Sequence, residues 1–97
     1  MWARIASFEG GDTAKLQKLN EERMQSGEMN LPQGIKRVMV LADDENSRRM
    51  FVTMFDNREA LHAAEPRFES MGEEVPEDVR GRRTDVGYYE VVFEQSM

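Results

Sequence analysis

Few side chains in this sequence can exchange protons near neutral pH. His62 is the single histidine, and because the imidazole group titrates near neutrality, we predict that it is a catalytic base or a donor to a substrate oxygen. The alternative is a partly exposed surface histidine, since on a helical wheel His62 lies next to Leu61 but off the main apolar stripe. The chemistry to expect is therefore proton transfer at one position.

Four aromatic side chains are candidates for the walls of a substrate pocket. They are Trp2, Phe55, Tyr88 and Tyr89. Because Tyr88 and Tyr89 are consecutive in a predicted strand, they point to opposite faces of the sheet, one toward the helices and the other toward a subunit interface. The alternative for each tyrosine is packing with one satisfied hydroxyl. Trp2 either packs in an interface or stacks on a ligand.

Charged residues offer two further possibilities. Arg4 and Glu90 occur in strands predicted to be neighbours, and we expect them to pair across the sheet; the alternative is that Glu90 acts as a base in a dry cavity. A basic cluster in the last loop either pairs with the protein's own acidic residues, which we expect, or contacts an anion such as phosphate. The cluster is Arg80, Arg82 and Arg83, and the acidic residues are Glu73, Glu74, Glu77 and Asp78.

The composition excludes several other classes of site. The 97 residues contain no cysteine, which removes disulfides, thiolate nucleophiles and iron–sulfur clusters, and a single histidine argues against a transition-metal site. Lys and Arg number 13 against 19 Asp and Glu, a net charge of −6, so neither nucleic acid nor an anionic membrane surface is an expected partner. No apolar stretch reaches the roughly 20 residues of a spanning helix, and no signal-peptide pattern is present. We predict a cytoplasmic protein without a transition-metal site.

Hydrophobic patterns place these residues on helices and strands. Apolar runs predict strands over residues 2–9, 35–42, 48–55 and 86–94. A helix is predicted to begin after Asp12, which serves as its N-cap, and to end near residue 24 or 26. Residues 27–34 and 43–47 are predicted connections.

The second helix has a clear amphipathic face. Its apolar positions are Leu61, Ala64, Phe68 and Met71. Asp56 is the predicted N-cap, with Glu59 in the capping-box position, and Gly72 is a plausible end. Pro66 must kink this helix or divide it after residue 64 or 65, because proline cannot donate to the carbonyl four residues back. Residues 73–85 are predicted to form a loop or a short helical turn.

The resulting β-α-β-β-α-β order predicts one α+β domain over residues 1–97. It fits a ferredoxin-like antiparallel sheet with two helices on one face. A half-solvated sheet should alternate apolar and polar residues cleanly, whereas here neither face of the strands is reliably polar. We therefore predict a homodimer, in which a second subunit buries the other face; the alternative is a monomer with an exposed apolar sheet.

In layout, nearly the whole chain resembles the antibiotic-biosynthesis-monooxygenase-like (ABM-like) group of the dimeric α/β barrel superfamily, and in particular its uncharacterised members. The resemblance is carried by residues 2–10 (WARIASFEG), 51–61 (FVTMFDNREAL) and 89–91 (YEV). It implies a homodimer with its sheets face to face and a ligand cavity between each sheet and its own helices. Many ABM-like proteins also have a histidine a few residues before a proline on the second helix, the position that His62 occupies relative to Pro66.

The resemblance implies a cofactor-independent monooxygenase that acts on a small aromatic or quinol-like molecule, with His62 as the base. The substrate anion would then react with oxygen directly, without metal or flavin. The alternative is a non-catalytic homodimer that binds a small hydrophobic ligand or serves as an interaction module. Haem-degrading relatives use an Asn, a Trp and a His that this chain does not match, because Trp2 lies in a different element and neither Asn20 nor Asn57 is on the first strand.

Overall fold

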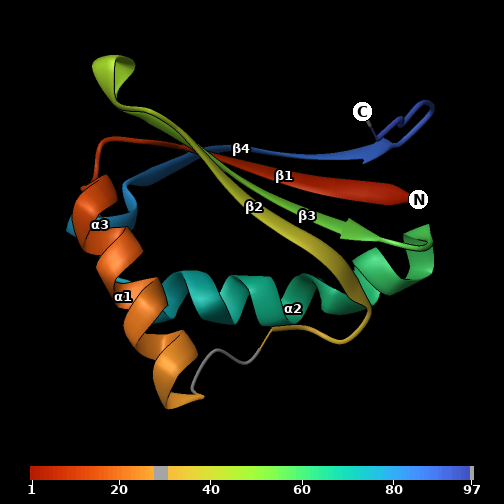
Figure 1. Ribbon diagram of the computed structural model, residues 1–97, viewed down its shortest axis with the longest axis horizontal. Helices are drawn as coiled ribbons and strands as arrows, with labels where there is room; N and C mark the ends of the chain where they lie inside the picture. Colours follow the sequence, from red (N-terminus) through yellow and green to blue (C-terminus); the bar gives the residue numbers. More distant parts are fainter. Residues whose placement is uncertain (28–30, 97) are drawn as a thin grey trace.

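The order of helices and strands in the computed structural model, which describes residues 1–27 and 31–96, is the predicted one (Figure 1). The strands are β1 (Trp2–Glu9), β2 (Ile35–Asp43), β3 (Arg48–Phe55) and β4 (Arg82–Glu90). The helices are α1 (Thr13–Ser26), α2 (Arg58–Glu74) and the short α3 (Glu77–Arg80), with a 3-10 turn, η1, at Asp44–Asn46. The strands form an antiparallel sheet in the order β2-β3-β1-β4. The predicted ferredoxin-like α+β fold is confirmed.

The ends of α1 follow from local sequence. The side chain of Asp12 accepts a hydrogen bond from the backbone N–H of Lys15 at 3.0 Å, as its predicted role as N-cap requires. The helix ends at Ser26, and Gly27 follows with a φ of 75°, a left-handed conformation that glycine adopts without a steric penalty. The predicted connection over residues 27–34 includes residues 28–30, which lie outside the described part of the chain.

The start and the end of α2 differ from the prediction. Asn57, not Asp56, is the N-cap, and its side-chain oxygen accepts from the N–H of Ala60 at 2.8 Å. Asp and Asn are about equally good N-cap residues, so residue type alone could not decide between positions 56 and 57. The helix is not divided at Pro66 and continues past Gly72 to Glu74. Pro66 is exposed, so water can reach the carbonyl that loses its partner.

Strand β4 begins and ends four residues earlier than predicted. It pairs with β1 from Arg82, opposite Glu9, to Glu90, opposite Trp2. Just beyond this pairing, the N–H of Val91 donates to the carbonyl of Met1 at 2.9 Å. The apolar run that suggested a longer strand therefore continues beyond the sheet as an exposed segment.

The face of the sheet that the helices cover, here called the inner face, holds the main core. Both long helices lie on this side in Figure 1, and the C-terminal segment leaves on the other side. The fully packed residues are Phe55, Leu61, Ala64 and Phe68, with Trp2, Ile35, Phe51, Ala60 and Met71 packed around them. The predicted apolar face of α2 is thus the face that meets the sheet.

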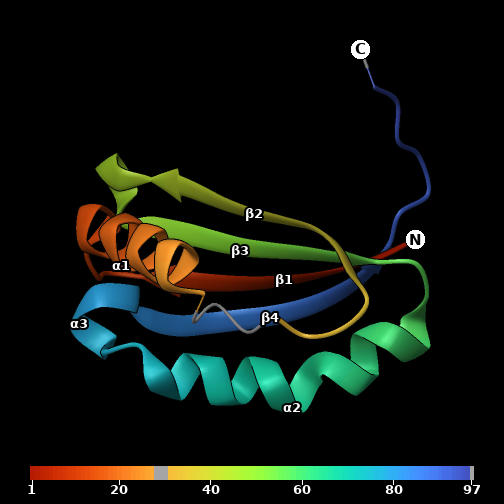
Figure 2. The same ribbon diagram turned by 60° about the horizontal axis from the view of Figure 1, so that its bottom comes forward.

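The opposite face, here called the outer face, is also apolar. Ala3, Val52 and Met54 form a second cluster there, with Ile5, Met39 and Val91 packed against it. No helix covers this side (Figure 2). The segment after β4 lies over part of it, since Val91 packs against this cluster and Glu94 lies 3.8 Å from Arg37 on β2. Within residues 1–27 and 31–96, no helix is long and apolar enough to cross a membrane.

Candidate functional site

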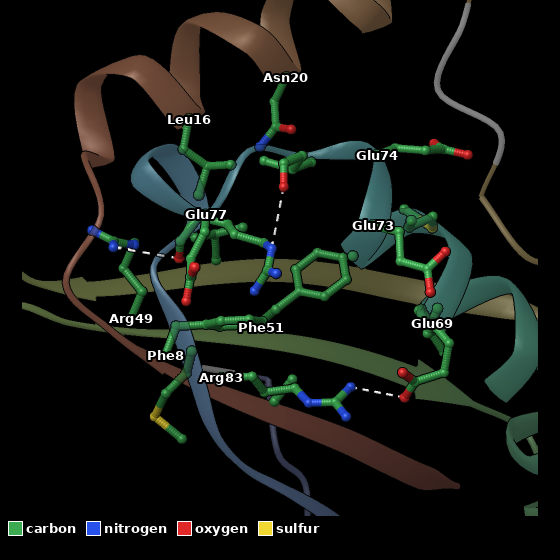
Figure 3. Close-up of a pocket in the computed structure, with 18 of the residues that line it drawn as sticks. Phe8, Leu16, Asn20, Arg49, Phe51, Glu69, Glu73, Glu74, Glu77 and Arg83 are labelled. Carbon is green, nitrogen blue, oxygen red and sulfur yellow. Dashed lines mark hydrogen bonds and ion pairs between the residues drawn. The ribbon is translucent and has the colours of Figure 1, made fainter.

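A cavity of about 410 Å³ lies between α1, the C-terminal half of α2, α3 and the inner face of the sheet (Figure 3). It exists because α1 does not pack closely onto the strands: α1 has no buried residue, and its apolar stripe is short. Leu16 and Asn20 point from α1 toward the sheet in Figure 3. The short apolar stripe of α1 therefore leaves a cavity between this helix and the sheet. By contrast, α2 buries three of its residues against the strands.

The walls of the cavity are largely aromatic and aliphatic. Phe51 and Phe68 meet edge to face, with ring centroids 6.4 Å apart. The other apolar lining residues include Phe8, Leu16, Val40, Met71 and Val75. Such walls suit a small molecule with a flat apolar body, and the volume falls in the range of ligand pockets, about 300–1,000 Å³.

Seven arginines and four glutamates also line the cavity, and most of the arginines are paired. They are Arg4, Arg23, Arg49, Arg67, Arg80, Arg82 and Arg83, with Glu69, Glu73, Glu74 and Glu77. Arg83 binds Glu69 at 2.8 Å, and Arg82 lies 3.6 Å from Glu9. Arg80 instead donates to the carbonyl oxygens of Val75 and Gly81 at 3.2 and 3.0 Å.

The predicted partners of the basic cluster were therefore wrong. Arg82 and Arg83 belong to β4 rather than to a loop, so their side chains reach along the sheet and toward α2. Of the expected acidic partners, Glu73 and Glu74 lie at the end of α2, and Glu77 and Asp78 lie on α3. No ion pair in the described part of the chain joins these residues to the cluster.

Arg4 is the centre of a polar network at the edge of the cavity. Its side chain is 3% exposed and binds both carboxylate oxygens of Glu65, at 2.9 and 3.0 Å. The guanidinium also lies 4.4 Å from the ring centroid of Phe68, a cation–π contact. The predicted pair with Glu90 was wrong, because the register places Arg4 opposite Tyr88 and leaves Glu90 exposed at the end of β4.

Within this network, Glu65 and Tyr88 each shift the pKa of the other. Burial works against ionisation of Glu65, but the hydrogen bonds and charge of Arg4 outweigh it and lower the pKa of the carboxyl. Burial raises the pKa of Tyr88, and the neighbouring Glu65 carboxylate raises it further. At neutral pH Glu65 is thus a carboxylate, and Tyr88 keeps its proton and hydrogen-bonds to it.

His62 lies at the margin of this network, on the exposed side of α2. Its Nε2 atom accepts a hydrogen bond from Nε of Arg58 at 3.1 Å, and its ring centroid is 5.5 Å from that of Tyr88. The guanidinium of Arg58 also lies 5.6 Å from the ring of Trp2. Three of the predicted site residues, His62, Tyr88 and Trp2, are therefore linked near the N-terminal end of α2.

The other two predicted residues are placed apart from these three. Phe55 is completely buried in the inner core, and Tyr89 lies on the outer face, half exposed. As predicted, Tyr88 and Tyr89 point to opposite faces of the sheet. None of the five predicted site residues lines the cavity.

The residues that do line the cavity were not singled out from the sequence as pocket walls. The most informative is Arg49, which is buried on the inner face of β3 in phase with Phe51 and Thr53. An arginine in the alternating series of a strand's buried side is an unusual signal, and it could have been read from the sequence. No group of three potential metal ligands is found among residues 1–27 and 31–96.

Comparison with known proteins shows similarity in structure but not in sequence. No protein-family profile matches the chain, and no curated protein matches it either. A mutant form of MhuD with two manganese protoporphyrin IX molecules bound per active site is 15% identical, with a TM-score of 0.62 over 100% of both chains.

Two further solved structures match across almost their whole length. Rv0793 from Mycobacterium tuberculosis is 15% identical, with a TM-score of 0.59 over 98% of each chain. A proposed antibiotic biosynthesis monooxygenase from Chloroflexus aurantiacus J-10-fl is 12% identical, with a TM-score of 0.58 over 98% of this chain and 96% of the other. At such low identity the likeness concerns the fold alone. The resemblance seen in the sequence is confirmed at that level: this protein has the fold of the ABM-like proteins.

Proposed function

We propose that this protein binds a small aromatic or quinol-like molecule in the cavity and oxidises it with molecular oxygen as a cofactor-independent monooxygenase. The observation that carries the proposal is the cavity itself, with Phe51, Phe68 and Met71 in its walls and a volume of about 410 Å³. Aromatic and aliphatic walls that hold the body of a ligand, together with polar groups that orient it, are typical of substrate sites, and here the polar groups are mostly charged. The fold shared with a proposed monooxygenase supports the same reaction class.

The proposed reaction needs a substrate that can form a stabilised anion. For a CH₂ group activated by neighbouring aryl and carbonyl groups, a base removes one proton and the carbanion combines with O₂. Loss of water from the resulting hydroperoxide leaves a carbonyl, so one oxygen atom enters the product and the other leaves in water. The substrate supplies all the electrons, and the protein supplies a dry site and a positioned base.

On this proposal His62 is the base, and the polar network connects it to the cavity. Arg4 contributes to the cavity wall and holds Glu65, Glu65 accepts a hydrogen bond from Tyr88, and the ring of Tyr88 lies beside His62. A substrate that extends from the cavity past Arg4 would bring its acidic carbon toward His62. Trp2 and Tyr88 would then form the walls at that end.

We further propose that the functional unit is a homodimer formed through the outer face, and that it works in the cytoplasm. The support is the apolar cluster around Val52 and Met54 on the uncovered side of the sheet, together with the exposed side chains of Val92 and Phe93 just beyond β4. Val52 and Met54 are themselves buried, and the exposed apolar side chains of this face include those of Leu41 and Tyr89. Exposed apolar side chains gathered on one face are typical of subunit interfaces. A partner's sheet would cover these side chains.

A second candidate function is non-catalytic ligand binding. One observation favours it: His62 is exposed and does not line the cavity. Glu65 is held in an ion pair with Arg4, and Glu69, which lines the cavity, is held in one with Arg83. A site built only to bind would need no free base. The two functions share the cavity and differ in whether O₂ is consumed.

Native mass spectrometry of freshly purified protein, followed by oxygen-uptake assays, tests these proposals. We expect a dimer mass and, where a ligand co-purifies, one additional discrete mass per subunit. Uptake of O₂ with anthrone at a rate above the uncatalysed oxidation, with anthraquinone as the product and no hydrogen peroxide released, supports a monooxygenase. Binding without uptake supports the second function, and a monomer at micromolar concentration contradicts the dimer.

A further inference from the structure

Arg49 is a buried cation without a carboxylate partner. Its side chain is 4% exposed, and no ion pair of Arg49 occurs in the part of the chain that the structure describes. Its Nη1 atom donates to the hydroxyl of Thr13 at 2.7 Å, and its Nη2 atom is 3.5 Å from the carbonyl oxygen of Arg80. Its Nε atom is buried with no hydrogen-bond partner. A buried charge normally requires a counter-ion.

The surroundings of Arg49 favour an anion rather than a neutral group. Arg49 lines the main cavity and also a smaller one of about 320 Å³ at the beginning of α1. The nearest carboxylate in this hydrogen-bonded chain, Asp44, binds the Thr13 hydroxyl at 2.7 Å and so reaches Arg49 only through that hydroxyl. Arg80, whose carbonyl oxygen lies beside Arg49, donates to the carbonyl oxygens of Val75 and Gly81 and forms no ion pair within residues 1–27 and 31–96.

We propose that Arg49 binds the anionic group of the ligand, so that the cavity takes an aromatic molecule with a carboxylate or phosphate group. The apolar body would lie against Phe8, Phe51 and Phe68, which line the same cavity, and the anion would accept from the buried guanidinium. This inference rests on the proposed ligand site but not on catalysis. It narrows the ligand class from aromatic molecules in general to aromatic acids.

A purely structural role for Arg49 is the competing explanation. Its two hydrogen bonds join β3 to the start of α1 and to the end of α3. A Cβ atom at position 11 would clash with Nη2 of Arg49, so the guanidinium packs tightly against the turn at Gly11. These contacts explain the position of Arg49 but leave its Nε atom and its charge unsatisfied. An anion in the cavity would supply the missing counter-charge.

The test compares matched aromatic probes by NMR at pH 7 on protein labelled at the methionine methyl groups. The probes are 1-naphthoate, its neutral isostere 1-naphthamide, 1-naphthyl phosphate and inorganic phosphate alone. The Met71 methyl reports on the cavity, whereas those of Met39 and Met54 report on the outer face. We expect naphthoate to shift Met71 and to bind at least about tenfold more tightly than naphthamide, as a charged hydrogen bond allows.

The contribution of Arg49 is measured in two ways. In the wild-type protein, naphthoate but not naphthamide should shift the Nε–H resonance of Arg49. In Arg49→Gln, the two probes should bind equally, whereas the matched control Arg48→Gln, which alters an exposed arginine paired with Asp43 outside the cavity lining, should keep the preference. Because the Nε–H measurement uses the wild-type protein, it decides the question even where Arg49→Gln fails to fold.

Each result either supports or overturns the inference. Equal affinity of naphthoate and naphthamide for the wild-type protein, or an unchanged preference in Arg49→Gln, overturns it while leaving the cavity as a ligand site. Failure of every aromatic probe to shift Met71 overturns the proposed ligand site as well. Tighter binding of naphthyl phosphate than of naphthoate assigns the anion as phosphate, and the reverse order assigns it as carboxylate. Inorganic phosphate alone should displace neither aromatic anion, because it lacks an apolar body to contact the cavity walls.

Discussion

The two helices that cover the inner face differ in how closely they approach the sheet. Helix α2 buries Leu61, Ala64 and Phe68 against the strands, whereas α1 buries no residue at all. The difference lies in the apolar stripe, which spans several turns in α2 and is reduced to Leu16 and Leu19 in α1. A full stripe produces a core, and a thin stripe produces a cavity. The inner face therefore has a packed half under α2 and a half with a cavity under α1.

The largest effect should come from truncating a core residue of α2. Leu61 is completely buried, so Leu61→Ala should lower the free energy of unfolding by about 2–5 kcal/mol. Leu19→Ala in α1 removes the same atoms from a half-buried position and should cost about 1 kcal/mol or less. Urea denaturation of both variants measures the contrast. Equal losses would show that α1 contributes to the core as much as α2.

The second-largest effect should be a loss of turnover on changing His62, near the N-terminal end of α2. If His62 is the base, His62→Ala should reduce turnover about 100-fold or more, the usual contribution of general-base catalysis. Its folding stability should change little, because His62 is exposed. Steady-state oxygen uptake and thermal melts measure the two quantities. His62→Gln is the control for shape, and unchanged turnover in both variants contradicts a catalytic His62.

The ion pair between Arg4 on β1 and Glu65 on α2 holds the second helix to the sheet, and breaking it should have an intermediate effect on stability. Glu65→Gln leaves the buried Arg4 without its counter-ion, and we expect a loss of about 2 kcal/mol, less than for a fully buried pair because the Glu65 side chain is 25% exposed. Glu69→Gln, which alters an exposed pair with Arg83, is the matched control and should cost about 1 kcal/mol or less.

The contribution of Glu65 should also depend on pH. Because Arg4 lowers the pKa of Glu65 in the folded state, the stabilisation is fully present above the ordinary pKa of a glutamate and is lost as pH falls through the lower, folded value. The stability difference between wild type and Glu65→Gln should therefore shrink in acid. Denaturation at several pH values measures it, and a difference that grows on acidification would contradict the assignment.

The smallest effect should come from making α1 resemble α2. Asn20 is half buried and points from α1 toward the sheet (Figure 3), so Asn20→Leu should extend the apolar stripe and raise the free energy of unfolding by about 0.5–1 kcal/mol. The added side chain should also occupy part of the cavity and weaken naphthoate binding. Gln17→Leu, at an exposed position of α1, is the control. A stabilised variant that binds as wild type would place the ligand elsewhere.

The sequence predicted the local features of the fold well and its long-range pairings poorly. Strands β1 and β3 have the predicted limits, and Asp12 caps α1 as expected. The limits of β4 were wrong because a strand ends where its partner ends, and the partner is about 80 residues away in the chain. Arg4 and Glu90 were assigned to each other for the same reason, since sequence shows which strands are neighbours but not their register.

The candidate site was harder to predict than the fold. His62, Tyr88 and Trp2 are linked, but the cavity lies farther along α2, near Arg49 and Phe51. Residue types alone favour rare side chains such as His and Trp, and this draws attention away from arginines whose partners are unknown. The alternation of Arg49 with Phe51 and Thr53 in one strand was a usable signal for a buried cation.

The sequence by itself determined the element order, the helix that would pack, and the apolar character of both sheet faces. These features depend on residues that are close in the chain, or on a repeating pattern whose meaning is local. Tertiary structure alone decided the register of β4, the pairing of Arg4 with Glu65, and the cavity beneath α1. Each of these depends on the distance between elements that meet only after folding, and on how much space a thin apolar stripe leaves between them.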